Sequence, residues 1–506
     1  MAKTTKSGKA NKSLVSGGMI VVVVAVILII ACFFTYISGI LPQTLTGITI
    51  TENNPDGTSK NIKNYSVLES NFHFKEVYDS YSQYGMVSAD TLDNVSNQET
   101  GDTYRDVLLR EAAGQMKTLT LVERAAKESG FMEISKAREI SAKNLETLEL
   151  YARLYGYPSG QSYLKALYGT GMTKRLYTDF AAREVLVNEY GSYLKQFDPS
   201  IVPTDDAVLA KYNEDTSIYS TLDYNLYFIK AETDKDGKVI GMDAAVKAAN
   251  KIADATKDSA SFRDAVLEYV KGTGDDAAVK TFDNGADPTL TKDFTYSVAT
   301  YMEASVKDYL FSDSKTGDKK VIQTEFGAYV IYIANKDNGD GKTVTYRILT
   351  LTADFKNEDT DDVKAAALQK TMADAQTMCP SGMDPLSFYK LVKDKTTNLN
   401  DKLEGGYNIH DADYFVSTES NPIDPSVVEA GKWLFDDARK QGDVFIIASE
   451  DKQTVYVFYF EAARPAWDVA IRNDMIAANF NDWNSKLDTG NYGYVINAGL
   501  VRYLVY

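Results

Sequence analysis

Cysteine is almost absent from this 506-residue sequence, which contains only Cys32 and Cys379. Because Cys32 lies inside a long apolar run, we expect no internal disulfide and a fold held together by core packing. Histidine is equally scarce, with His73 and His410 alone. Zinc-type spacings, nucleophilic triads and glycine-rich phosphate loops are all missing, which leaves a hydrolase with little support.

Positive charge is also in short supply. The chain has 54 Lys and Arg against 71 Asp and Glu, for a net charge of −17. Four of the lysines precede the apolar run, so the remainder has 50 basic and 71 acidic residues and a net charge of −21. This balance repels nucleic acid, and we predict no nucleic-acid partner.

The long apolar run, Met19–Leu41, has no charged residue over 23 positions. It is long enough to span a bilayer as a helix, and the lysines before it place residues 1–18 in the cytoplasm as a basic tail. We predict a signal anchor at 19–41, a single-pass cell-membrane protein and an extracytoplasmic bulk. In the alternative, "IIAC" (Ile29–Cys32) resembles a lipobox and Cys32 carries a lipid. The length argues against a buried core helix.

After the apolar run, residues 42–217 are expected to form a mainly helical module. "NPDGT" between two short β-like runs indicates an initial hairpin. Apolar residues then recur with helical spacing to about residue 217, and Gly130, Gly156 and Gly191 are expected at helix C-termini. No strand-like run interrupts this block.

A repeat fills the next part of the chain. "GAYVIYIANK" (Gly327–Lys336) is echoed by "TVYVFYFEAA" (Thr454–Ala463), and the opening strands align with Tyr224 on Tyr346. Such self-similarity predicts a duplicated β-α-β domain, at 218–340 and 341–464. Residues 465–506 then predict an amphipathic helix, with Trp467, Phe480 and Trp483, followed by a strand.

This order resembles the SurA/PrsA-type extracytoplasmic foldases. The resemblance covers most of residues 45–490 and rests on Ser162–Tyr190, which is similar to their recurring helix pair, and on "EGGYNI" (Glu404–Ile409) and "KWLFDDARKQGDV" in the second repeat. It implies an α+β multidomain fold: a transmembrane helix, an all-α chaperone-like module and two tandem parvulin-like peptidyl-prolyl isomerase domains, each a small antiparallel sheet with helices. The resemblance also implies that a C-terminal helix packs back on the module.

The sequence departs from that family at its two histidine positions. The position on the first strand is Asn225 in one repeat and Arg347 in the other, and the position on the last strand is Tyr329 or Tyr456. Prolyl isomerisation breaks no covalent bond and does not strictly need an acid or base. We nevertheless expect the repeats to bind rather than catalyse, and we assign no catalytic residue.

Several side chains are candidates for a binding site. The resemblance suggests a client-binding groove formed by Tyr309, Phe311, Tyr329, Trp433, Phe435 and Tyr456. The alternative is that "YLF" and "WLF" are core anchors, since aromatic residues at helical spacing are usually core.

Metal sites have less support. The stretch "ETDKDGKVIGMD" is close to a calcium loop, with acids at Glu232, Asp234, Asp236 and Asp243, but we favour an Asp-Gly turn there. His73 is expected at the surface or in an interface, and His410 with two nearby loop acids is weak evidence for a metal. We therefore predict no metal and no cofactor.

The function predicted from these features is an extracytoplasmic chaperone or foldase for unfolded or proline-containing polypeptides. Its binding surface should be apolar and distributed, with the helical module and the C-terminal helix as its cradle. The alternatives are an active peptidyl-prolyl isomerase and an envelope scaffold that binds partners.

Overall fold

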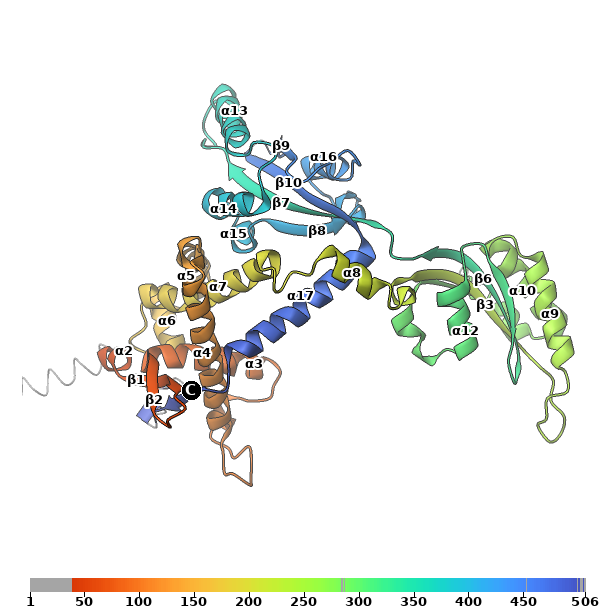
Figure 1. Ribbon diagram of the computed structural model, residues 1–506, viewed down its shortest axis with the longest axis horizontal. Coiled ribbons are helices and arrows are strands. Elements are labelled where there is room, and N and C mark those ends of the chain that lie inside the picture. Colours follow the sequence, from red (N-terminus) through yellow and green to blue (C-terminus); the bar gives the residue numbers. More distant parts are fainter. Residues whose placement is uncertain are drawn as a thin grey trace, which may run out of the picture.

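The computed structural model describes residues 39–283, 285, 287–451, 453–497, 499, 500 and 504. These form a mixed α+β structure with three small antiparallel sheets in three bodies (Figure 1). The predicted anchor lies outside the described residues except for positions 39–41, and Cys32 lies outside them too. Within the described part of the chain, no helix is both long and apolar enough to cross a membrane.

The first body joins the two ends of the chain. Strand β1 (Thr46–Asn53) pairs with β2 (Ser59–Ser66) as the predicted hairpin, and β11 (Tyr492–Ile496) adds to its other side, giving the order β11-β1-β2. The family resemblance implied an all-α module, and the structure differs because a three-stranded sheet belongs to it. The β1–β2 hairpin follows from the local sequence pattern. The pairing of β11 with β1 does not, because these two strands are more than 400 residues apart in the chain.

Helices build the rest of this body, in the order α2 (Ile40–Thr44), α3 (Val67–Gln83), α4 (Tyr104–Glu128), α5 (Ala137–Leu154), α6 (Gly160–Tyr168), α7 (Lys174–Phe197) and α8 (Asp205–Tyr212). Side chains define several helix starts. Thr103 accepts the N–H of Asp106, and Asp106 accepts the N–H of Thr103, so two free donors of α4 are satisfied. Apolar residues of α3 and α4 bury against the β1–β2 hairpin and form the core of the module.

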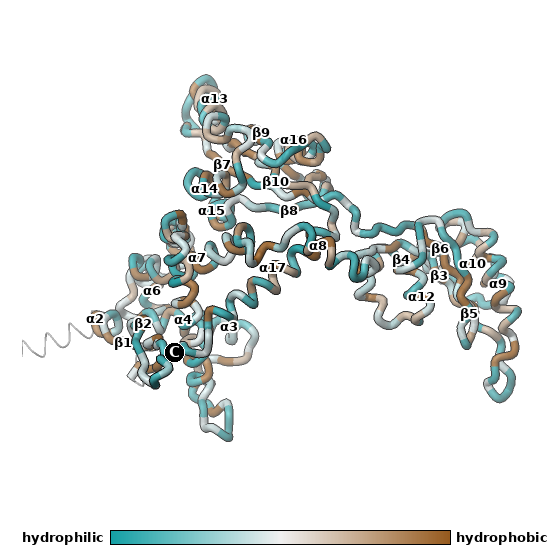
Figure 2. The backbone as a smooth tube through the Cα atoms, in the orientation of Figure 1, coloured by the Kyte–Doolittle hydropathy of each residue, from teal (hydrophilic) through white to brown (hydrophobic). Residues whose placement is uncertain are grey.

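The second body is the first repeat. Its strands are β3 (Thr221–Lys230), β4 (Leu290–Thr295), β5 (Lys319–Gln323) and β6 (Gly327–Asp337), in the order β4-β3-β6-β5. Helices α9 (Met242–Ala255) and α10 (Ser259–Thr273) cover one face. Helix α12 (Ala304–Asp308) and the π-helical turn Tyr309–Asp313 cover part of the other. Figure 2 shows hydrophobic segments along β3 and β6 at the centre of this body.

The third body repeats this plan, as the duplication predicts. Its strands are β7 (Lys342–Thr352), β8 (Tyr407–Asp411), β9 (Val444–Ala448) and β10 (Thr454–Pro465), in the equivalent order β8-β7-β10-β9. Its helices are α13 (Asp361–Met378), α14 (Pro385–Lys395), α15 (Leu399–Glu404) and α16 (Pro425–Leu434). The echoed sequences are thus the inner strands β6 and β10.

Helix α17 (Ala466–Leu487) runs from the third body back to the module (Figure 1). Its Ile476, Phe480 and Trp483 pack against a core of α4 and α7 residues. Near its start, Trp467 stacks on Tyr212 of α8 with ring centroids 3.9 Å apart. The family resemblance implied this return of the C-terminal helix to the module.

Candidate functional site

One face of the first repeat's sheet is only partly covered. Near α12, residues such as Tyr224 and Ile331 are buried under the turn that contains Phe311. Beyond this cover, Phe228 and Tyr329 lie opposite each other on β3 and β6, half buried, with ring centroids 4.6 Å apart. This open sheet face is an aromatic surface that can pack against an apolar side chain.

The end of the β5–β6 hairpin borders this surface. Phe326 is exposed and immediately precedes Gly327, where an added Cβ would lie 2.1 Å from the Ile229 carbonyl oxygen. Glycine therefore allows β3 and β6 to approach each other closely beside the ring of Phe228. The predicted binding residue Tyr329 is thus on an accessible face, and its role in binding stays a prediction.

Two other predicted residues of this repeat are in the core. Tyr309 and Phe311 are 6% and 2% exposed and pack with Leu310 and Ile333. A side chain so enclosed offers no surface to a client unless the domain opens. Their placement fits the core-anchor alternative for "YLF".

In the second repeat, the predicted residues are half buried on the face covered by α16. Trp433 stacks on Phe445 at 5.5 Å, and the Arg439 guanidinium lies 5.0 Å from the Trp433 ring. Phe435 and Tyr456 border the same apolar cluster. These three side chains keep some accessible surface, and their binding role also stays a prediction.

The four family histidine positions do not converge. Asn225 lies opposite Tyr332, which packs on the α9–α10 side of the sheet, whereas Tyr329 packs on the α12 side. In the second repeat, Arg347 and Tyr456 likewise lie on opposite faces of the sheet. Because strand residues alternate between faces, each matched pair lies on opposite sides of its sheet. In neither repeat can the side chains at the two positions therefore contact each other across the sheet.

In the second repeat, Arg347 lies opposite Tyr459, away from Tyr456. Its buried guanidinium pairs with Glu461 and donates to the Gly405 carbonyl oxygen and to Gln196 Oε1, at 3.1 and 2.8 Å. Gln196 belongs to α7 of the helical module. Arg347 thus helps to attach the second repeat to the module.

Further polar contacts reinforce that attachment. Lys393 of α14 pairs with Glu189 of α7, and both side chains are buried. Lys402 of α15 pairs with Glu139 of α5 at 2.6 Å. A cavity of about 330 Å³ lies at this junction, and cations in its wall such as Arg347 and Arg472 already have carboxylate partners. The geometry is that of a structural interface.

The helical module presents an exposed apolar patch at the end of α5. We call Leu150, Tyr151, Leu154 and Tyr155 the α5 patch; they are 66%, 46%, 73% and 63% exposed. The Tyr155 ring stacks with that of Tyr163 at 5.8 Å and with that of Tyr151 at 6.5 Å. On the preceding turns of α5, Leu145 and Leu148 pack against a core. Tyr151 and Tyr155 continue the stripe of Leu148 at i+3 and i+7, and Leu150 and Leu154 lie beside that stripe. Because this end of the helix is exposed, all four side chains are available to a partner.

The predicted cradle combined the helical module, which contains α5, with the C-terminal helix, and its role in binding stays a prediction. Trp467, Phe480 and Trp483 of α17 are half buried and serve to attach the helix to α7 and α8. The signal for the α5 patch is present in "ELYARLYGY", where apolar residues occupy more than one stripe of the helix. Deciding which stripe is buried requires the neighbouring helices.

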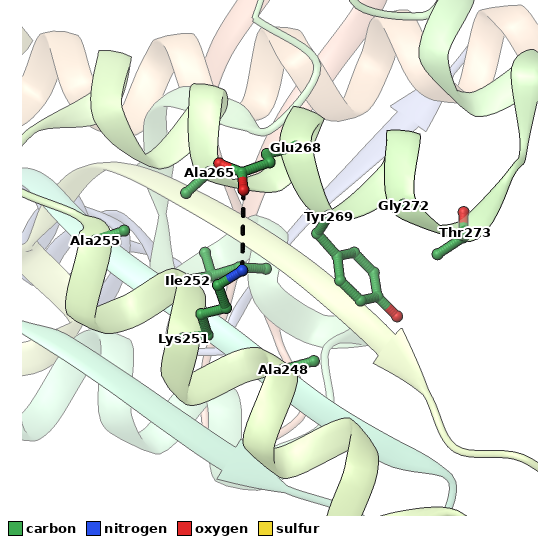
Figure 3. A pocket seen from close by; sticks show the side chains of 9 residues that line it. All are labelled: Ala248, Lys251, Ile252, Ala255, Ala265, Glu268, Tyr269, Gly272 and Thr273. Carbon is green, nitrogen blue, oxygen red and sulfur yellow. Dashed lines mark ion pairs between the residues drawn. The ribbon is translucent and has the colours of Figure 1, made fainter.

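A shallow groove of about 360 Å³ runs between α9 and α10 of the first repeat (Figure 3). Its lining includes Ala248, Ile252 and Tyr269, and Lys251 and Glu268 face each other across it with 3.8 Å between charged atoms. This exposed ion pair contributes little to stability. The groove brings together no acid, base or nucleophile set.

The predicted calcium-loop alternative has a local explanation. Asp234 Oδ1 accepts the backbone N–H groups of Asp236 and Lys238, and Thr233 bridges to Val239. Among the described residues, the acids of this loop do not gather as metal ligands. The arrangement is the Asp-Gly turn that we favoured.

Neither histidine lies in these surfaces. His410 stacks on Tyr414 at 3.5 Å, its Nδ1 is 3.1 Å from the Tyr346 hydroxyl, and burial lowers its pKa. His73, expected at the surface or an interface, is instead buried inside the module. The sequence around it predicts an amphipathic helix, and the neighbouring elements, including β2 and α7, enclose the side chain.

Comparison with known proteins adds one observation. No family model and no curated protein matches this chain. Among solved structures, the foldase protein PrsA from Streptococcus pneumoniae is similar, with 13% sequence identity over 84% of this chain and 93% of that chain, and a TM-score of 0.19. Because this TM-score is low, the likeness carries no argument about function.

Proposed function

We propose that this protein is a membrane-anchored, extracytoplasmic chaperone or foldase that holds unfolded polypeptides through exposed apolar side chains. The α5 patch carries the proposal. Unfolded clients share little except exposed apolar segments, and a rigid helix with adjacent Leu and Tyr side chains can pack against many of them. The apolar run at 19–41 and the lysines before it support the anchor and its orientation.

Charge supports the same role. The chain has a net charge of −17, so copies of the protein repel one another despite the exposed patch. A holding chaperone needs this combination, because an apolar surface without net charge would associate with itself.

The two repeats are proposed to bind peptide segments without isomerising them. In each repeat, the matched histidine positions hold other residues and lie on opposite faces of the sheet. An active isomerase remains the second candidate, because the open surface of Phe228 and Tyr329 offers an apolar site that needs no acid or base. An envelope scaffold is the third.

The main test is aggregation of an unfolded client at stoichiometric amounts of the full chain. Leu150→Ser with Leu154→Ser should raise the amount of protein needed for protection at least about tenfold, because each leucine buried by a client contributes about 1.5 kcal/mol. Leu209→Ser is the matched control, since Leu209 is also an exposed leucine on a helix but lies outside the patch. Full protection by the double variant would contradict the proposal.

Proline-limited refolding separates the candidates. Uncatalysed isomerisation takes tens of seconds, so acceleration by catalytic amounts of protein is easily timed. We expect none. Acceleration that is lost in Tyr329→Ala would instead favour the isomerase, and neither protection nor acceleration would favour the scaffold.

A further inference from the structure

Three potential metal ligands converge inside the helical module. His73 and Glu76 lie one turn apart on α3, and Glu184 faces them from α7. The His73 Nδ1 is 3.0 Å from Glu184 Oε1 and 3.4 Å from Glu76 Oε2. One ligand atom from each of the three residues lies within 4.8 Å of the other two. This cluster is separate from the α5 patch and from both repeats.

These separations suit a small divalent cation. Zinc binds histidine nitrogen and carboxylate oxygen at about 2.1 Å, so two ligands of one tetrahedral ion lie about 3.4 Å apart, and two neighbouring ligands of an octahedral ion about 3.0 Å. The two distances from His73 Nδ1 fall at these values. The side chains would need little movement to enclose an ion.

The surroundings leave one side open. The His73 side chain is 4% exposed and lies edge-on to the rings of Phe72 and Tyr65. By contrast, the Glu76 and Glu184 side chains are 37% and 33% exposed. An ion can therefore enter from the carboxylate side, and water can complete its coordination there.

A proton in place of an ion explains the cluster less well. The buried Nε2 of His73 has no hydrogen-bond partner among the described residues. A doubly protonated imidazole would place a charged N–H group at this apolar position, which is costly. With an ion on Nδ1 the ring is neutral, so the buried Nε2–H is an uncharged donor, which costs less to bury than the N–H of an imidazolium. The ion also offsets the repulsion between the two neighbouring carboxylates.

We propose that His73, Glu76 and Glu184 bind one divalent transition-metal ion of the zinc type. The mixed nitrogen and oxygen donor set favours zinc over calcium, which prefers oxygen ligands alone. The ion would connect α3 to α7 and so stabilise the module on which the α5 patch is built.

The test is calorimetric titration of the full chain with Zn²⁺ after removal of metal with EDTA. We expect one site in the wild-type protein, and affinity at least about tenfold lower in His73→Gln and in Glu184→Gln. His410→Gln is the matched control, because it removes the only other histidine of the chain and should leave binding unchanged. Absence of binding, or equal affinity in His73→Gln, would overturn the proposal.

Two measurements guard against a misfolded variant. Circular dichroism in EDTA checks the fold, and Glu76→Gln replaces a partly exposed ligand and should also weaken binding. In the wild-type protein, Co²⁺ should give the visible absorption of nitrogen and oxygen ligands. A thiolate band would place the metal on a cysteine and contradict the assignment.

Discussion

Lys393 carries an ammonium group into a position where its side chain is only 1% exposed. Burial lowers its pKa, and Glu189 of the module opposes that effect. Glu189 is fully buried and also accepts from the Ser135 hydroxyl and the Lys136 N–H. The two charges compensate each other across the boundary between the module and the second repeat. Loss of either one would leave the other buried without an opposite charge.

Removing one charge should therefore be costly. Lys393→Met is expected to lower the free energy of unfolding by about 3 kcal/mol, because it leaves the Glu189 carboxylate buried without a cation. Urea unfolding of the full chain measures this value. Lys390→Met on the same helix is the control, since Lys390 is exposed. The double variant Glu189→Gln with Lys393→Met should recover most of the loss, and failure to recover would show that the pair does not act as a unit.

Asp401 supplies a prediction on pH. Burial raises its pKa to about 6, although the Thr350 hydroxyl donates to its carboxylate at 2.6 Å. The folded pKa lies above the unfolded value of about 3.9. The folded state therefore holds the proton more tightly, and stability decreases as the pH rises from about 4 through 6.

Asp401→Asn should remove this component. Relative to the variant, the wild-type protein should lose about 2 kcal/mol of stability between pH 4 and pH 7. Urea unfolding of both proteins at the two pH values gives the difference. A stability difference that does not change with pH, or changes in the opposite direction, would contradict the assignment.

At the scale of elements, two helical glycines have opposite surroundings. Gly431 of α16 faces Phe415, and an added Cβ would lie 2.4 Å from Phe415 side-chain atoms. Gly114 of α4 has no atom within 4 Å of the same position. The first glycine is needed for close packing of a helix on its neighbour, and the second only lowers helix propensity.

Alanine at the two sites should therefore act in opposite directions. Gly114→Ala should raise the free energy of unfolding by about 0.5–1 kcal/mol, and Gly431→Ala should lower it by about 1–3 kcal/mol through overpacking. Thermal and urea unfolding test both changes in the same chain. Stabilisation by both substitutions would show that α16 can shift away from Phe415 at little cost.

At the scale of the whole molecule, the two repeats are attached differently. The second repeat contacts the module through buried or partly buried ion pairs, including Lys393 with Glu189 and Lys402 with Glu139. Among the residues that the structure describes, no ion pair connects the first repeat (residues 221–337) to the rest of the chain. The linker that follows it contacts the start of α17, where the Trp467 N–H donates to the Gly339 carbonyl oxygen at 3.0 Å. In Figure 1 this repeat extends away from the other two bodies.

Fragments test this difference. Both repeats have their own apolar cores, so fragments 219–340 and 341–464 should fold. In fragment 341–464, Lys393 has lost Glu189 and becomes solvent-accessible, so Lys393→Met should change its stability by less than about 0.5 kcal/mol. The same substitution should cost about 3 kcal/mol in the full chain. Equal effects in both would show that the contact between the bodies is not what holds the lysine.

The sequence by itself determined the features that depend on local spacing. The β1–β2 hairpin, the helices of the module, the repeated strands β6 and β10 and the amphipathic α17 all follow from periodicity, turn residues and self-similarity, because each is encoded within a few residues. The core-anchor alternative for Phe311 rests on the same kind of local pattern, the helical spacing of aromatic residues.

Only the tertiary structure decided which faces meet. It placed β11 beside β1, put Asn225 and Tyr329 on opposite faces of one sheet, buried His73 beside Glu184 and left the α5 patch exposed. Each outcome depends on residues far apart in the chain. A local pattern shows where the apolar stripes of one element lie, but it does not show which other elements will cover them. The physical reason is that burial is a property of packing between elements, whereas periodicity is a property of one element alone.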